Sequence, residues 1–381
     1  MTTFRLPIFL PTVLNLRVNV TMVILAMGAL GLPAKHALSQ TGQAEAKVDS
    51  PPAFSLHDGQ HDFDFNIGVW HTHICRILDP LSGSTHSIEL NGTVTVRKVW
   101  GGRAQLEEIE ADGPKGHWEG LTLFLYNPQS RQWSQSFIDS KIAELGSPLI
   151  GSFQDGRGEL FAQDTFHGKS VLIRGVWSNI VPDSHHFEES LSNDGGKTWA
   201  PAFIGELTRE TQPATTAPGS NTTTEEGQHD FDFDFGTWKT HSSRLLHPLT
   251  GSQTWADMDG ITVVKKVWDG RANSAEYKAD GPAGHVELMA LRWFNPTTHE
   301  WNLDFATPQV GTLGIPGVGV FKNGRADFYD YEPINGRSVL VRFSIWSITA
   351  NTAQSEQAFS ADGGKTWEVN WINKYNRIGE E

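Results

Sequence analysis

Apolar and polar residues alternate along most of the chain after about residue 60, as in β-strands with one buried face, and helical periodicity is hard to find. Turn sequences such as Asp269-Gly270 and Asn323-Gly324 separate the alternating runs, because these residues accept positive φ. Short strands joined by tight turns pair with their sequence neighbours, which predicts an up-and-down antiparallel barrel. In the second half of the chain, the expected strands are 236–246, 253–268, 271–279, 285–294, 300–306, 317–323, 326–332, 337–348, 353–361 and 367–377.

The chain carries a duplication of a whole domain. Gly-Gln-His-Asp-Phe-Asp-Phe begins at Gly59 and again at Gly227, an offset of 168 residues. Ser-x-Asp-Gly-Gly-Lys-Thr-Trp begins at Ser192 and at Ser360 with the same offset, and resembles the Asp-box turn of sialidases. It occurs once per half, so we interpret it as the last hairpin of each domain. The prediction is an all-β protein with two tandem antiparallel barrels of about ten strands, over 59–209 and 227–378.

Residues 1–39 have the features of a secretory signal peptide. An apolar run from Val18 to Leu32 precedes Ala37-Leu38-Ser39, a small-x-small cleavage site. An uncleaved membrane anchor is the alternative, but a span needs about 20 apolar residues and this run is shorter. We therefore expect cleavage near Ser39, no stable membrane insertion afterwards, and a periplasmic or extracellular protein. The polar segments 40–58 and 210–226 are expected to be a disordered lead-in and a flexible linker.

Composition narrows the function. The net charge of −14 and the lack of a Lys/Arg cluster exclude nucleic acid as a partner. Cys75 is the only cysteine, which rules out an intrachain disulfide and a thiolate zinc cluster. Sequence motifs of the common hydrolases, kinases and dehydrogenases are absent. The sequence gives no indication of oligomeric state.

Polar residues retained in both halves are the candidates for chemistry. His117 and Glu119 continue an apolar face with Leu121 and Leu123, so they are expected inside the barrel near its mouth, as a possible acid–base pair. Arginines on a later strand would bind an anionic or carbonyl group. The competing interpretation is a set of charged pairs that satisfy one another. The candidate ligand-binding residues are His117, Glu119, Arg174, Glu188, His285, Glu287, Arg342 and Glu356.

The repeated phrase itself could suggest a metal site, since it contains His61, Asp62 and Asp64. Strict alternation favours a structural role instead, in a first strand that closes each barrel. In that interpretation Phe63 and Phe65 cover the closed end while the aspartates face water. No metal site is predicted.

A Gly-x-Trp on the first strand and an Arg on the last strand occur in both halves, as Gly68-x-Trp70 with Arg209 and as Gly236-x-Trp238 with Arg377. This pair resembles the calycin superfamily of lipocalins, fatty-acid-binding proteins and nitrobindin-like barrels. The His-Asp-Phe-Asp-Phe phrase is also similar to a secreted bacterial family of lipocalin-like domains. The resemblance implies that Trp70 and Trp238 plug the closed ends beneath Arg209 and Arg377, and that a small-molecule cavity lies at the open end.

The first functional hypothesis is therefore the binding of small hydrophobic or amphipathic molecules in the barrel. A lyase, isomerase or hydrolase that uses the His–Glu pair on a hydrophobic carbonyl substrate is an alternative, as is a carbohydrate or surface interaction module that uses exposed aromatics. Haem is one ligand to consider, because nitrobindin-like barrels bind it through a His; no other cofactor is expected. The halves diverge at Trp118/Val286 and Trp177/Ile345, which favours binding over catalysis in both.

Overall fold

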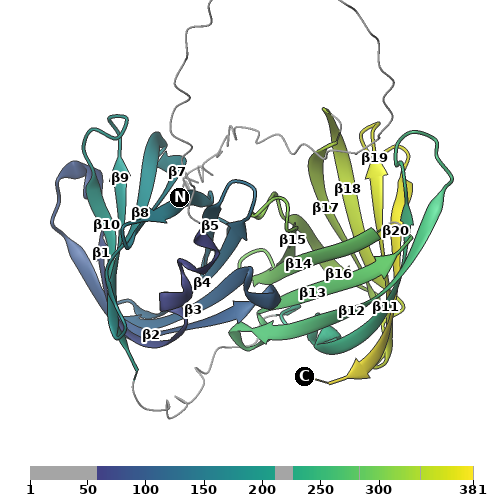
Figure 1. The fold of residues 1–381 in the computed structure, drawn as a ribbon, viewed down its shortest axis with the longest axis horizontal. Coiled ribbons are helices and arrows are strands. Elements are labelled where there is room, and N and C mark those ends of the chain that lie inside the picture. The colour runs from purple at the N-terminus through teal and green to yellow at the C-terminus, as the bar shows by residue number, and fades with distance from the viewer. Residues whose placement is uncertain (1–57, 211–225, 283, 335, 381) are drawn as a thin grey trace, which may run out of the picture.

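The computed structural model describes residues 58–210, 226–282, 284–334 and 336–380 as two closed ten-stranded antiparallel barrels side by side (Figure 1). This confirms the predicted fold class. The expected leader, most of the lead-in and most of the linker lie outside the described residues. The first barrel contains β1 (Gly68–Ile77), β2 (Ser87–Val99), β3 (Ala104–Gly113), β4 (Gly116–Asn127), β5 (Gln132–Asp139), β6 (Leu149–Gln154), β7 (Arg157–Phe166), β8 (Lys169–Val181), β9 (Ser184–Ser192) and β10 (Ala200–Arg209).

The second barrel repeats this order. Each strand pairs with its sequence neighbours, and each barrel closes by pairing of its first strand with its last, with Trp70 opposite Arg209 and Trp238 opposite Arg377. Closure leaves no free sheet edge. The strands are β11 (Gly236–Leu245), β12 (Trp255–Val267), β13 (Ala272–Gly281), β14 (Gly284–Asn295), β15 (Glu300–Ala306), β16 (Gly317–Lys322), β17 (Arg325–Ile334), β18 (Arg337–Trp346), β19 (Thr352–Ser360) and β20 (Glu368–Gly379).

The repeated His-Asp-Phe-Asp-Phe phrase does not form the expected strand. It folds into short 3-10 turns, η1 (Gly59–His61) and η2 (Asp64–Asn66), stabilised by Asn66 N–H donating to the Phe63 carbonyl at 3.0 Å. Phe63 is fully buried among Phe124, Trp133, Phe153 and Trp177. A strand over these residues would run past the closed end of the barrel. The observed turn instead directs the Phe63 ring into that end, and the free energy gained by burying the ring outweighs the local preference for a strand.

Each closed end is sealed by the same tryptophan–arginine stack. The Arg209 guanidinium lies 4.0 Å from the centre of the Trp70 ring, and Arg377 lies 4.1 Å from that of Trp238. Both indoles are fully buried. Arg209 also donates hydrogen bonds to the carbonyls of Ile67 (2.9 Å) and Phe65 (3.0 Å), so it fastens η2 to the end of β10.

The Asp-box sequences lie in the turns between β9 and β10 and between β19 and β20, which is the last hairpin of each barrel. The Asp194 carboxylate accepts hydrogen bonds from the backbone N–H of Lys197 and Thr198, each at 3.0 Å. These bonds hold the pKa of Asp194 below its ordinary value. The motif thus acts as a turn brace.

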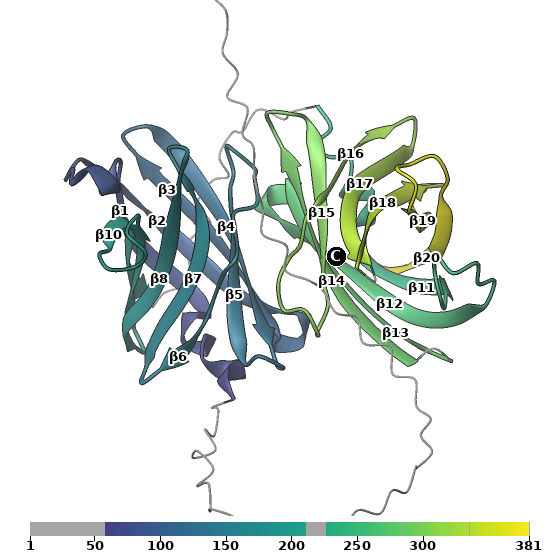
Figure 2. The same ribbon diagram turned by 90° about the horizontal axis from the view of Figure 1, so that it is seen from above.

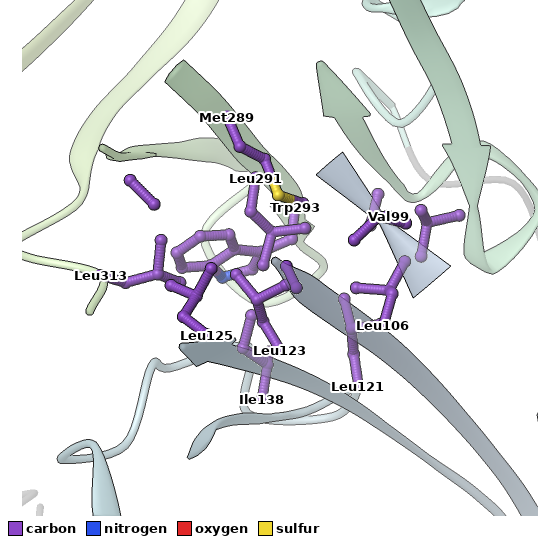
Figure 3. Close-up of a cluster of buried hydrophobic side chains, with 14 of the residues drawn as sticks. Val99, Leu106, Leu121, Leu123, Leu125, Ile138, Met289, Leu291, Trp293 and Leu313 are labelled. Atoms are coloured by element: carbon purple, nitrogen blue, oxygen red, sulfur yellow. The ribbon is translucent and has the colours of Figure 1, made fainter. Parts of the chain in front are cut away.

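The two barrels share an interface with a buried apolar cluster, built from their outer faces (Figures 2 and 3). Leu121, Leu123 and Leu125 on β4 belong to the same buried cluster as Leu291 and Trp293 on β14. An apolar stripe on the outside of a barrel is unfavourable in water, and the repeat resolves this by packing each stripe against the other.

Candidate functional site

The expected lumen face of β4 is in fact its outer face. Glu119 alternates with Leu121 and Leu123 as predicted, but this row faces the second barrel. Trp118 and Thr122, on the opposite face of β4, line the interior. Alternation identifies the two faces of a strand without saying which is inside, and here both faces are buried. The prediction that His117, Glu119, His285 and Glu287 line the lumen is therefore wrong about the side of the sheet.

The interface holds these glutamates in reciprocal contacts. Arg271 of the second barrel donates to both carboxylate oxygens of Glu119, at 2.7 and 2.5 Å. In the reverse direction, Arg103 of the first barrel donates to one carboxylate oxygen of Glu287. His117 and His285, nearer the rim, lie 3.1 and 2.7 Å from Asp112 and Asp280. The His117–Glu119 pair, at 3.8 Å, is thus part of an ion cluster between barrels.

A second reciprocal pair reinforces the first. The Glu108 carboxylate accepts a hydrogen bond from the backbone N–H of Trp268 (3.1 Å), and Glu276 accepts one from Trp100 (2.8 Å). The partners exchange at the same 168-residue offset as the duplication. Contacts in which i meets j and j meets i are those of an isologous two-fold interface.

The remaining candidates lie on the outer wall beside the Asp-box. Arg174 stacks 4.6 Å from the ring centre of Trp199, and Arg342 lies 4.9 Å from that of Trp367. Arg342 also pairs with Glu356 at 3.1 Å. Glu188 accepts a hydrogen bond from Ser190, at 2.5 Å. These four residues do not converge with the His–Glu pairs, because β8 and β4 are separated by three strands and both sets point outwards.

The first barrel encloses a cavity of about 430 Å³ that none of the eight candidates lines. Its walls are mainly apolar, with Ile74, Ile109, Trp118, Trp177 and Phe203 among them. Known small-molecule sites occupy roughly 300–1,000 Å³ and combine apolar walls with a few polar groups. The volume and the lining fit that description.

The buried polar side chains in this cavity are those of Glu107, His185 and Gln135, together with the smaller Thr72 and Thr122. The Glu107 carboxyl accepts hydrogen bonds from Asn66 Nδ2 (3.1 Å) and Thr122 Oγ1 (2.9 Å). Burial raises its pKa above the ordinary value. The His185 ring stands edge-on to Trp70, with centroids 4.5 Å apart. Burial lowers the pKa of His185 to about 4, so the ring is neutral at pH 7. The third of the larger side chains, Gln135, lies on β5.

Contacts with the plug place two of these groups at the closed end. Asn66, the partner of Glu107, ends η2, and its carbonyl accepts from the Trp70 indole at 2.7 Å. Gln135 lies opposite Phe124, which packs against Phe63 at the same end, and we call Glu107, Gln135 and His185 the floor. At the other end, Arg76 lies 5.5 Å from the ring centre of Trp118. Its charge partly offsets the burial that raises the pKa of Glu189.

A chain of hydrogen bonds crosses the corresponding interior of the second barrel. Tyr277 Oη lies 2.6 Å from Ser242 Oγ, which lies 2.6 Å from Asn373 Oδ1. Asn373 Nδ2 then donates to Ser355 Oγ (3.0 Å), which lies 2.9 Å from Tyr375 Oη. In the first barrel the five equivalent positions line the cavity and are apolar or glycine: Ile109, Ile74, Gly205, Phe187 and Leu207.

Residues shared by the two halves do not reveal this cavity, because its polar groups are not retained in the second half. Glu107, Gln135 and His185 correspond to Ala275, Leu303 and Ala353 in the second half. The signal in the sequence was the divergence already visible at Trp118/Val286 and Trp177/Ile345. Differences between the halves mark the cavity, whereas the shared pairs Glu119/Glu287 and Arg103/Arg271 mark the interface.

Two further observations cover the residues that the structure describes. Among the described residues, no group of three His, Cys, Asp or Glu side chains is arranged to hold a metal ion. The same residues include no helix with the length and apolar character to cross a membrane. His61 and Asp64, from the repeated phrase, form an exposed pair at 3.0 Å.

Comparison with known proteins gives only distant structural similarity. No family model matches the chain, and no curated protein matches its sequence. An S-type phycobiliprotein lyase from Guillardia theta aligns at 10% identity and a TM-score of 0.31, over 40% of this chain and 92% of its own. A protein of unknown function from the DUF3598 family of Nostoc punctiforme aligns at 9% and 0.25, over 84% and 99%. The protein EF1p2_mFAP2b, solved with DFHBI bound, aligns at 7% and 0.24, over 40% and 99%. Scores this low carry no functional conclusion.

Proposed function

We propose that the protein binds one small, predominantly apolar molecule in the cavity of its first barrel. The observation that carries this proposal is the 430 Å³ interior with apolar walls and a polar floor. Burial of an apolar ligand there gains about 25 cal/mol for each Å² removed from water. The walls come from nearly every strand of a closed barrel, so the site is largely formed before the ligand arrives.

The second barrel has a different role in this proposal. Its interior carries the hydrogen-bonded chain from Tyr277 to Tyr375, where the first barrel has apolar groups and glycine. It contributes the outer face that covers the apolar stripe of β4. We therefore expect one ligand per chain.

The catalytic and carbohydrate alternatives gain less support. The His117–Glu119 pair of the catalytic hypothesis is engaged at the interface by Arg271. Exposed aromatics do occur on the outer wall, among them Phe161 and Tyr329, but neither of these two lines the cavity. Haem remains a ligand to test, and absence of a Soret band after haem addition would remove it.

The leader expected in residues 1–39 further suggests that binding takes place outside the cytoplasm. N-terminal sequencing of the mature protein tests this directly. A start near Gln40 is the expected result, whereas a chain that begins at Met1 would refute export by cleavage.

Titration with Nile red, an uncharged dye whose emission shifts to the blue in apolar surroundings, tests the binding proposal. We expect saturable binding at one site per chain. Gly205→Leu places a side chain in the cavity and should abolish the Nile red signal, because it occupies the space of the dye. The barrel should tolerate this change, since a Cβ at this position meets only Leu207, Phe203 and Phe187 at ordinary contact distances. Asn373→Leu, the same side chain at the equivalent position of the second barrel, is the matched control and should keep the stoichiometry of one. No saturable binding by the wild type would refute the proposal.

A further inference from the structure

The floor of the cavity has hydrogen-bonding capacity that the protein does not use. The side chains of Glu107, Gln135 and His185 are each at least nine-tenths buried. His185 Nδ1 and Gln135 Oε1 have no hydrogen-bond partner in the protein. A buried polar atom without a partner is energetically unfavourable, so a ligand group that pairs with it is favoured over one that cannot.

The distribution of charge disfavours an ionised ligand at this end. Arg76 is the one lysine or arginine among the residues that the structure shows lining the cavity, and it lies towards the mouth with Glu189. Arg209, near His185, is engaged by backbone carbonyls and by the face of Trp70. A carboxylate at the floor would therefore lose its water and meet the Glu107 carboxyl without a compensating cation.

Glu107 is the third polar group that the floor offers to a ligand. Burial raises the pKa of the Glu107 carboxyl, and in its uncharged form this group carries an O–H donor. Neutral His185 has one N–H and one bare nitrogen, and Gln135 presents an unpaired acceptor oxygen. The unpaired His185 nitrogen and Gln135 oxygen, together with the Glu107 carboxyl at the end of an apolar cavity, match a hydroxyl group, which can accept one hydrogen bond and donate another.

We propose that the first barrel selects apolar molecules that carry an uncharged hydroxyl group, and that Glu107, Gln135 and His185 bind this hydroxyl at the closed end. This inference rests on the proposed function and specifies its ligand class. It also assigns ligand selection to three residues of the first barrel that have no polar counterpart in the second.

Displacement of Nile red by four ten-carbon probes at pH 7.5 tests the inference. We expect 1-decanol to compete at least tenfold more strongly than decanoate, decylamine or decane. Decanoate or decylamine as the best competitor would overturn it, because the floor would then prefer a charge. Equal competition by decane and 1-decanol would also overturn it, since the floor would not distinguish the hydroxyl.

Variants separate this inference from the proposed function. Glu107→Gln keeps an uncharged donor and acceptor and should hold the 1-decanol affinity within threefold, whereas Glu107→Leu and His185→Phe should each lower the preference for 1-decanol over decane about tenfold. An unchanged preference in both apolar variants would refute the role of the floor while leaving cavity binding intact. Failure of the wild type to bind Nile red or any of the four probes would instead refute the proposed function.

Discussion

Arg271 of the second barrel grips both carboxylate oxygens of Glu119 in the first, and Arg103 grips Glu287 in the reverse direction. This exchange explains why the charges are present in both halves. A domain that once paired with a copy of itself would need the same charges on each copy, and a duplicated chain keeps them as long as the two-fold contact persists. Retention of these interface charges in both halves therefore reflects the assembly of the two barrels.

The Glu119–Arg271 pair should determine how strongly the barrels hold together. Glu119 is 8% and Arg271 16% exposed, so loss of one partner leaves an uncompensated buried charge. We expect Glu119→Leu to weaken association of the barrels by about 3–5 kcal/mol, and the double variant Glu119→Leu/Arg271→Met to recover much of this loss. Association is measured by dilution after cutting a protease site inserted between Glu210 and Glu226.

The matched control is the exposed Arg157–Glu159 pair at 2.8 Å. Its removal should cost no more than about 1 kcal/mol. Equal effects of the two pairs, or halves that separate freely in the wild type, would contradict the isologous interface.

The second barrel shows which residues could fill the cavity of the first barrel. Transfer of its five-residue chain, as Ile74→Ser, Ile109→Tyr, Phe187→Ser, Gly205→Asn and Leu207→Tyr, should keep the barrel folded because the transplanted groups satisfy one another. Nile red affinity should fall at least a hundredfold, with an unchanged far-UV circular dichroism spectrum. A folded graft that binds like the wild type would show that the dye binds elsewhere.

Ionisation of Glu107 gives a stability signature. Its pKa is raised in the folded state, so its contribution to stability is complete below the ordinary value of 4.5 and is lost as pH rises towards the folded pKa. The free energy of unfolding of Glu107→Gln should therefore rise relative to that of the wild type by up to about 1.4 kcal/mol for each pH unit above pH 4.5. Urea denaturation from pH 4 to 8 measures this difference. A difference that does not change with pH would mean that Glu107 is not buried as described.

His185 should have the opposite dependence. Its pKa falls from 6.5 to about 4 on folding, so the neutral ring contributes stability above pH 6.5 that is lost as pH falls towards 4. His185→Phe should lessen acid destabilisation in this window by up to about 3 kcal/mol. The comparison is the urea midpoint of each protein at pH 7 and pH 4.5. Parallel losses in both proteins would contradict a buried neutral histidine.

Most of the architecture could be predicted from the sequence. Alternation and the constant 168-residue offset predicted ten strands per barrel, and Gly68-x-Trp70 pointed to the end that is plugged. Two features could not be predicted. A period of two does not say which face of β4 is interior when the other packs against a second barrel, and the turn at Phe63 depends on rings from distant strands. The floor was missed because Glu107 and His185 have no counterpart in the second half.

The central claim is that the first barrel, and not the second, holds an apolar ligand. A crystal structure of the full chain soaked with 10-bromodecan-1-ol tests it most directly, since anomalous scattering locates the bromine without prior assumptions. We expect one bromine peak per chain, inside the first barrel and towards its mouth near Leu78 and Phe166. The hydroxyl group should lie at Glu107. Bromine peaks confined to the second barrel or to the outer surface would contradict it.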